Sequence, residues 1–81
     1  ISAKSNQREA HAWVVVPLFN EAKVVGAVIE ELTQHFMHVV CVDDGSTDGS
    51  AEIAENAGAR VLRHPLNLGQ GAALQTGFDY I

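Results

Sequence analysis

Three short apolar runs alternate along the chain with three segments of helical periodicity. The runs cover residues 13–17, 38–42 and 59–63, and the first two are rich in Val, which favours β-strands. Strand–helix alternation of this kind predicts a parallel sheet with right-handed crossovers. We therefore expect an α/β fold of three layers, in which helices cover an open, mostly parallel sheet.

The three helical segments differ in how clearly they are bounded. The first follows Asn20, which we expect to be its N-cap, with Glu21 in the first turn. Its predicted buried side consists of Val24, Val25, Val28, Ile29, Leu32 and Phe36. The second is expected to end at Gly58. Its N-cap is one of three polar residues, Ser46, Thr47 or Asp48. The third follows Gly71 and carries Ala72, Ala73, Leu74 and Phe78.

The size and composition fit one small globular domain. The chain has 81 residues, of which 47% are hydrophobic. Residues 1–12 are polar and aperiodic, so we expect a disordered or solvated tail there and a single domain over residues 13–81. The sequence begins at Ile1 and stops at Ile81 inside a helical pattern, so we expect it to be the N-terminal part of a longer protein.

Charge and hydropathy exclude several classes of partner. The net charge is −5, which argues against a surface for nucleic acid or anionic membrane. No apolar stretch approaches the roughly 20 residues of a membrane span. The single cysteine, Cys41, lies inside an apolar run, where we expect a reduced, buried thiol.

The second apolar run ends in two adjacent carboxylates, Asp43 and Asp44. Buried strands exclude charge from their interiors, so the acids fit the end of the strand, at an edge of the sheet. In open α/β sheets ligands bind at that edge. The loops after the three strands, residues 17–21, 43–48 and 64–71, are expected to converge there and to form a nucleotide pocket.

A carboxylate at this edge would select a base by its hydrogen-bond donors. It only accepts hydrogen bonds, so it favours uracil, which offers N3–H, or guanine, which offers N1–H and an amino group. Phe19 offers a flat apolar wall for such a base. The alternative is that the two acids, Asp43 and Asp44, merely cap and stabilise a turn.

Other patterns near the acids allow further interpretations. Residues 69–71, Gly-Gln-Gly, are equally compatible with an anion contact and with a flexible turn. The spacing of acids and hydroxyls from Asp44 to Glu55 matches the calcium loop of an EF-hand, although an apolar run typical of a strand enters it. Of the four histidines only His64 falls near the expected site, and nothing in the sequence assigns it a chemical role.

Three motifs together resemble the family-2 glycosyltransferases. They are residues 14–21 (VVVPLFNE), 42–49 (VDDGSTDG) and 67–77 (NLGQGAALQTG). The similarity is greatest to the branch that includes dolichyl-phosphate mannose synthases and bacterial polyprenyl-phosphate sugar transferases. It implies the N-terminal half of a GT-A, Rossmann-like domain, which binds a nucleotide-diphospho-sugar whose sugar is transferred with inversion.

The resemblance also implies roles for individual residues. Asp44 corresponds to the carboxylate that reads the base, Asp43 supports it, and residues 67–71 close over the nucleoside. The full set implied to bind the nucleotide is Pro17, Phe19, Glu21, Asp43, Asp44, Asn67, Gly69 and Gln70.

The family's catalytic parts are expected outside this stretch. The resemblance implies a divalent cation, Mg²⁺ or Mn²⁺, with ligands beyond residue 81, and no catalytic residue within the 81, which alone are expected to be inactive. It implies a UDP- or GDP-linked donor and a polyprenyl-phosphate, dolichyl-phosphate or saccharide acceptor, used in the cytoplasm or at the cytoplasmic face of a membrane. The alternative is a non-catalytic nucleotide-binding or self-associating module, because a small sheet leaves its edges uncovered.

Overall fold

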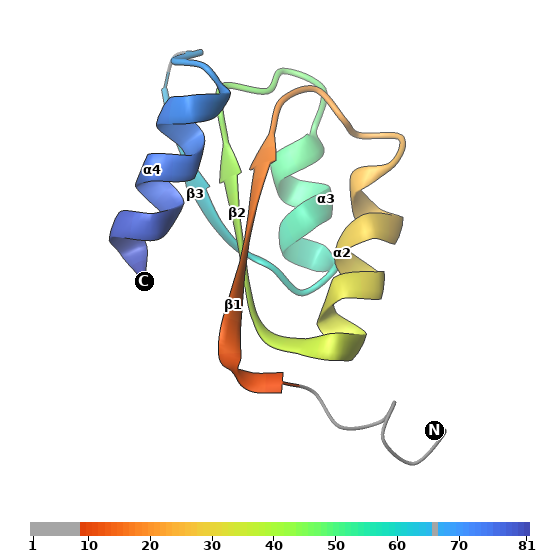
Figure 1. Ribbon diagram of the computed structural model, residues 1–81. Helices are drawn as coiled ribbons and strands as arrows, with labels where there is room; N and C mark the ends of the chain where they lie inside the picture. The colour runs from red at the N-terminus through yellow and green to blue at the C-terminus, as the bar shows by residue number, and fades with distance from the viewer. Residues whose placement is uncertain (1–8, 66) are drawn as a thin grey trace.

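The computed structural model describes residues 9–65 and 67–81 (Figure 1). Strands and helices alternate along it as the sequence predicts. In chain order the elements are β1 (Glu9–Leu18), α2 (Val25–His35), β2 (Phe36–Asp43), α3 (Ser50–Asn56), β3 (Arg60–Arg63) and α4 (Gln70–Tyr80).

The strands form one parallel sheet in the order β1-β2-β3. Helices α2 and α3 cover one face of this sheet, and α4 covers the other (Figure 1). The predicted fold class, a three-layer α/β fold with an open parallel sheet, is confirmed.

Strand β2 supplies both faces of the core because its side chains alternate across the sheet. Val39 and Cys41 pack in the cluster beneath α2 and α3, whereas Val40 and Val42 pack against Ala73 of α4. Cys41 is fully buried, as expected for a core thiol. Burial, with a smaller effect of the Asp43 charge, raises the pKa of Cys41 to about 12, so the thiol stays protonated.

The carboxyl ends of the strands lie level with one another. Leu18 of β1 is paired with Asp43 of β2, and Asp43 is paired with Arg63 of β3. The ladder continues one residue further, because Asp44 N–H donates to the Leu18 carbonyl and His64 N–H to the Asp43 carbonyl, both at 2.8 Å. The three following loops therefore leave the sheet at one edge, as predicted.

Strand β1 is longer than the apolar pattern indicates. It begins at Glu9, which is paired with Phe36 at the start of β2, so residues 9–12 belong to the sheet and not to a tail. Residues 1–8 of the expected tail lie outside the described residues. The strand also continues past Pro17 to Leu18, which its position at the edge of the described sheet allows, because the missing N–H of proline is not needed there.

The start of the first helix was predicted wrongly. Asn20 is not its N-cap: α2 begins at Val25, and the Glu21 carbonyl accepts the N–H groups of Val24 and Val25. Asn20 instead adopts a positive φ of 52° and bonds with the second loop. Of the side chains predicted to be buried on this helix, Val25 and Ile29 are buried, whereas Val24 and Val28 are exposed.

Smaller differences concern the ends of the other elements. Phe36, which was assigned to the first helix, begins β2, and Ala59 precedes β3. The N-cap of α3 is Gly49, not one of the three polar residues before it. Gly58, with a φ of 117°, ends α3 as predicted. The side chain of Phe78 on α4 is exposed.

The packing of α4 on β1 yields a matched pair of predictions. Gly77 is buried, and an added Cβ would overlap Val15 Cγ1 of β1 and lie 3.2 Å from its Cγ2. Gly71, on the same helix, has open space around it. Because Val15 is branched at Cβ and turns little, Gly77→Ala should lower the free energy of unfolding by about 1–3 kcal/mol.

Gly71→Ala is the control. It gains helix propensity without a clash, so it should raise the free energy of unfolding by up to about 1 kcal/mol. Urea titration followed by circular dichroism at 222 nm measures both variants. Equal stabilities would show that α4 does not pack on β1 in this way.

Candidate functional site

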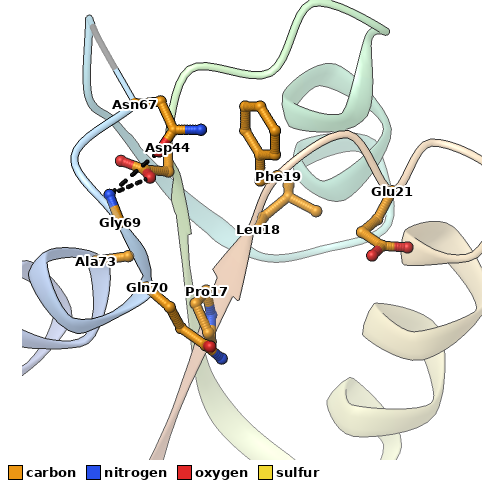
Figure 2. A pocket seen from close by; sticks show the side chains of 9 residues that line it. All are labelled: Pro17, Leu18, Phe19, Glu21, Asp44, Asn67, Gly69, Gln70 and Ala73. Atoms are coloured by element: carbon orange, nitrogen blue, oxygen red, sulfur yellow. Dashed lines mark hydrogen bonds between the residues drawn. The ribbon is translucent and has the colours of Figure 1, made fainter.

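A cavity of about 340 Å³ lies where the three loops meet (Figure 2). Seven of the eight residues assigned to the site from the sequence line it: Pro17, Phe19, Glu21, Asp44, Asn67, Gly69 and Gln70. Leu18 and Ala73 complete the lining. The end of β1 forms one side, and the loop before α4 with the first turn of that helix forms the other.

Asp44 is the hydrogen-bonding centre of the cavity wall. Its Oδ1 accepts the Leu68 N–H at 2.9 Å, and its Oδ2 accepts the Gly69 N–H at 2.7 Å. Gly69 has a φ of 100°, which favours glycine and lets its N–H reach the carboxylate. The Gly69 N–H is therefore used within the protein, so the Gly-Gln-Gly segment does not offer this group to an anion.

His64 bonds with Asp44, a contact that was not predicted from the sequence. Its Nδ1 lies 2.9 Å from Asp44 Oδ1, and its Nε2 lies 2.7 Å from the Thr76 hydroxyl of α4. Since an ionised carboxylate only accepts, Nδ1 carries the proton and donates it. The imidazole thus joins Asp44 to α4. The only sequence signal was the place of His64 at the end of a strand.

These donors also stabilise the charge on Asp44. The Leu68 N–H, then the His64 side chain and the Gly69 N–H hold the pKa of this carboxyl below its usual value, against the opposing effect of desolvation. The side chain is nearly buried yet ionised at neutral pH. The cavity therefore has a fixed negative charge in its wall.

Asp43, the eighth predicted residue, does not line the cavity. It lies on the side of the sheet that Cys41 faces, because adjacent side chains alternate. Its Oδ2 accepts the Ser46 N–H at 3.2 Å, whereas Oδ1 has no hydrogen-bond partner among the described residues, 9–65 and 67–81. Asp43 thus shapes the turn after β2 from behind the cavity.

Hydrogen bonds tie the first loop to the second. The hydroxyl groups of Ser46 and Ser50 accept the N–H groups of Asn20 and Glu21, both at 2.8 Å. In return, the Asn20 side-chain oxygen accepts the Thr47 N–H at 2.9 Å. Asn20 and the second loop therefore hold Phe19 and Glu21 in position at the cavity.

Asp48 completes this connection. Its Oδ2 accepts the Ala22 N–H at 3.1 Å, and its Oδ1 accepts both the N–H and the hydroxyl of Ser50. The Ser50 hydroxyl has the largest effect in lowering the pKa of Asp48, and the N–H groups of Ala22 and Ser50 lower it further. Asp48 is therefore a structural acceptor that supports the start of α3 without being its N-cap residue.

This arrangement is not that of an EF-hand. Strand β2 enters the loop, Glu55 is exposed on α3, and Asp44 and Asp48 bond with different neighbouring loops. Over residues 9–65 and 67–81, no three His, Cys, Asp or Glu side chains gather closely enough to hold a metal ion. The EF-hand arrangement considered for Asp44–Glu55 is therefore not the one that this loop adopts.

The fold and the cavity define the general class of protein. A parallel α/β sheet carries, at its carboxyl edge, a cavity lined by a fixed carboxylate and by an aromatic residue, Phe19, which is 43% exposed. This is the usual position of a nucleotide or similar ligand in open α/β sheets. In the described part of the chain, no helix is long and apolar enough to cross a membrane.

Comparison with known proteins identifies the family. Residues 13–81 match the profile described as glycosyl transferase family 2, and the chain therefore belongs to that family. The resemblance seen in the sequence is confirmed.

Similar proteins include several sugar transferases. An uncharacterized protein of Methanocaldococcus jannaschii is 48% identical over 80% of this chain and 27% of its own length. A dolichyl-phosphate beta-glucosyltransferase of Trichomonas vaginalis is 32% identical, over 85% of this chain and 25% of its own. A dodecaprenyl-phosphate galacturonate synthase of Rhizobium johnstonii is 36% identical, over 82% and 23% respectively. The chain thus spans about a quarter of the length of these relatives.

A solved structure supports the same assignment. The glucosyl-3-phosphoglycerate synthase of Mycobacterium tuberculosis, in complex with phosphoglyceric acid, superposes with a TM-score of 0.74 at 26% identity. The match covers 99% of this chain and 31% of that protein. The predicted GT-A fold is confirmed.

The lowered pKa of Asp44 leads to a prediction about acid stability. Because the pKa of Asp44 is lower in the folded state than in the unfolded state, the unfolded state binds more protons as the pH falls. The contribution of Asp44 to the free energy of unfolding is therefore complete above about pH 5 and is lost as the pH falls through the folded-state pKa. In thermal melts, the melting temperature of Asp44→Asn should fall less between pH 7 and pH 2.5 than the melting temperature of the wild type.

Asp79→Asn is the matched control. Asp79 is exposed on α4 and accepts a hydrogen bond from Gln75, away from the cavity. It should retain the acid dependence of the wild type. An Asp44→Asn variant with the wild-type dependence would contradict the assignment of Asp44 as a strongly hydrogen-bonded, ionised carboxylate.

Proposed function

We propose that this chain binds the nucleotide of a nucleotide-diphospho-sugar and serves as the nucleotide-binding part of an inverting glycosyltransferase. The observation that carries the proposal is the fixed Asp44 carboxylate in a cavity lined by Phe19, at the carboxyl edge of the sheet. A buried acceptor beside an aromatic surface suits a base, which has N–H donors on its edge and an apolar face.

Each side of the cavity has a separate role in this proposal. Asp44 accepts a hydrogen bond from the base, while Phe19 and Pro17 contact its face. Glu21 and Gln70 offer polar groups for the rest of the nucleotide, and residues 67–69 lie against the nucleoside. Asp43 acts indirectly, since it holds the turn after β2 through the Ser46 N–H.

The reaction itself would follow from the family. In an inverting transfer, an acceptor oxygen attacks the anomeric carbon as the bond to the diphosphate oxygen breaks, and that oxygen leaves with the electron pair. The names of two relatives include dolichyl phosphate and dodecaprenyl phosphate. We extend this to the present protein as a polyprenyl-phosphate or dolichyl-phosphate acceptor, used at the cytoplasmic face of a membrane.

A divalent cation, Mg²⁺ or Mn²⁺, would offset charge on the departing diphosphate. The three aspartates of the second loop do not form a site for it: Asp44 and Asp48 are hydrogen-bonded to N–H donors of different loops, and Asp43 faces away from the cavity. No step is therefore assigned to a metal held by these residues.

Nucleotide binding tests the proposal directly. Titration calorimetry of the protein with UDP and with GDP, with and without Mg²⁺ or Mn²⁺, should show saturable binding of at least one nucleotide. Asp44→Ala should weaken that binding about tenfold to hundredfold, because it removes a charged acceptor. The amide signals of Leu68 and Gly69 in ¹⁵N NMR spectra should shift on addition of the nucleotide.

The control is Asp79→Ala, which removes a carboxylate outside the cavity and should bind as the wild type does. Binding of neither nucleotide would show the proposed function to be wrong. Normal binding by Asp44→Ala would leave the function standing and remove Asp44 from it.

A further inference from the structure

We propose that a second cavity, at the amino ends of the strands, binds small aromatic oxyanions, that is, a single planar ring that carries a carboxylate or phosphate group. This cavity measures about 200 Å³ and lies at the opposite end of the sheet from the first. The C-terminal end of α4 lies beside it, whereas the N-terminal end of that helix lines the first cavity (Figure 1). The inference is independent of the proposed function, because the two cavities have no described lining residue in common.

The second cavity is found where β3 starts later than β2. Arg60, the first residue of β3, is paired with Val40, so residues 36–39 of β2 have no strand on that side among the described residues. His38 of this stretch lines the cavity, as does Gly58 in the turn before β3. The unequal starts of the two strands thus leave a recess at this end of the sheet.

Aromatic side chains form one wall of the recess. The rings of Trp13 and His38, which are paired across β1 and β2, stack with their centroids 4.2 Å apart and their planes at 10°. The rings of Trp13 and Tyr80 of α4 form an edge-to-face pair, with centroids 6.3 Å apart. These contacts hold the rings in place, yet Trp13 and Tyr80 remain 39% and 42% exposed. Together with Met37, which also lines the cavity, they offer an apolar surface that suits a planar ring.

Arg60 supplies a positive charge next to this wall. The guanidinium carbon, Cζ, lies 5.8 Å from the centre of the Tyr80 ring, within the range of a cation–π contact. No carboxylate among the described residues forms an ion pair with Arg60, whereas Arg63, on the same strand, is paired with Glu52 at 3.2 Å. The guanidinium can therefore donate to an incoming oxyanion, and its planar fork matches two oxygen atoms of a carboxylate or phosphate.

The two cavities have opposite charge. The described lining of the first includes the carboxylates of Glu21 and Asp44 and no Lys, Arg or His. The described lining of the second includes Arg60 and His38 and no Asp or Glu. In a chain with a net charge of −5, this local reversal of sign favours an anion at the second cavity and disfavours it at the first.

The volume limits the ligand to a single ring. Sites for drug-sized ligands measure about 300–1,000 Å³, so a cavity of about 200 Å³ takes a smaller molecule. Benzoate and phenyl phosphate are of this size. The ring of such a ligand would lie against Trp13 and Met37, and its oxygen atoms would contact the Arg60 guanidinium.

Tryptophan fluorescence tests the binding, because Trp13 is the only tryptophan of the chain. Benzoate and phenyl phosphate should each change this fluorescence with saturation, at a dissociation constant of about 1 mM or below, as expected for ligands with so few atoms. Inorganic phosphate lacks the ring and benzyl alcohol lacks the charge, so both should bind about tenfold more weakly or worse.

Two matched pairs of exposed residues locate the site. Arg60→Gln should weaken the binding of benzoate about tenfold, because it removes the charge, whereas Arg63→Gln should leave it unchanged. Tyr80→Leu should weaken it about threefold through loss of the ring. Phe78→Leu, which replaces an exposed ring of the same helix outside the cavity, should have no effect. Circular dichroism checks that the four variants remain folded.

Amide signals in ¹⁵N NMR spectra show which cavity is occupied. Benzoate should shift the signals of His38 and Gly58 and leave those of Leu68 and Gly69 in place. The proposal would be overturned by the absence of saturable binding of either ring anion, by equally tight binding of benzyl alcohol, by equal affinities of Arg60→Gln and Arg63→Gln, or by shifts confined to Leu68 and Gly69. These titrations contain no nucleotide, so their result stands whether or not UDP or GDP binds to the first cavity.

Discussion

Hydrogen bonds from backbone N–H groups to the carboxylates of the second loop hold the candidate site together. Asp48 accepts the Ala22 N–H of the first loop, and Asp44 accepts the N–H groups of Leu68 and Gly69 in the third. These bonds are charge-assisted, and they satisfy backbone donors that loops leave without partners in the sheet. The loop between β2 and α3 therefore fixes both of its neighbours, and the cavity depends on it.

The adjacent residues Asp43 and Asp44 have different roles in this arrangement. Alternation across a strand directs Asp44 into the cavity, beside α4, and Asp43 to the opposite face, near Cys41. Asp44 is surrounded by donors that keep it charged, whereas one oxygen of Asp43 has no partner among the described residues. The two adjacent carboxylates thus differ in place: Asp44 lies in the cavity wall and Asp43 lies behind it.

The sequence predicted what depends on local pattern and on strand order. Runs such as 38–42 marked the strands, and parallel strands bring the loops that follow them to one edge, so most of the cavity lining was identified. Contacts between loops were not predictable, because no periodicity encodes them. Asn20 is a good N-cap by type, yet its bonds with Ser46 and Thr47 move the start of α2. His64 was missed because its partner lies 20 residues earlier in the chain.

The Asp44 carboxylate both holds the third loop and lies in the wall of the cavity, and these two roles are linked through its limited number of acceptor positions. Each donor that fixes the third loop on Asp44 occupies one of these acceptor positions. The attachment of the loop and the capacity of Asp44 to accept further hydrogen bonds are therefore not independent properties. A change at His64 or Thr76, which do not line the cavity, would alter the set of donors around Asp44. The hydrogen-bonding capacity of Asp44 is thus set by the network behind the cavity wall as well as by the residues that line the cavity.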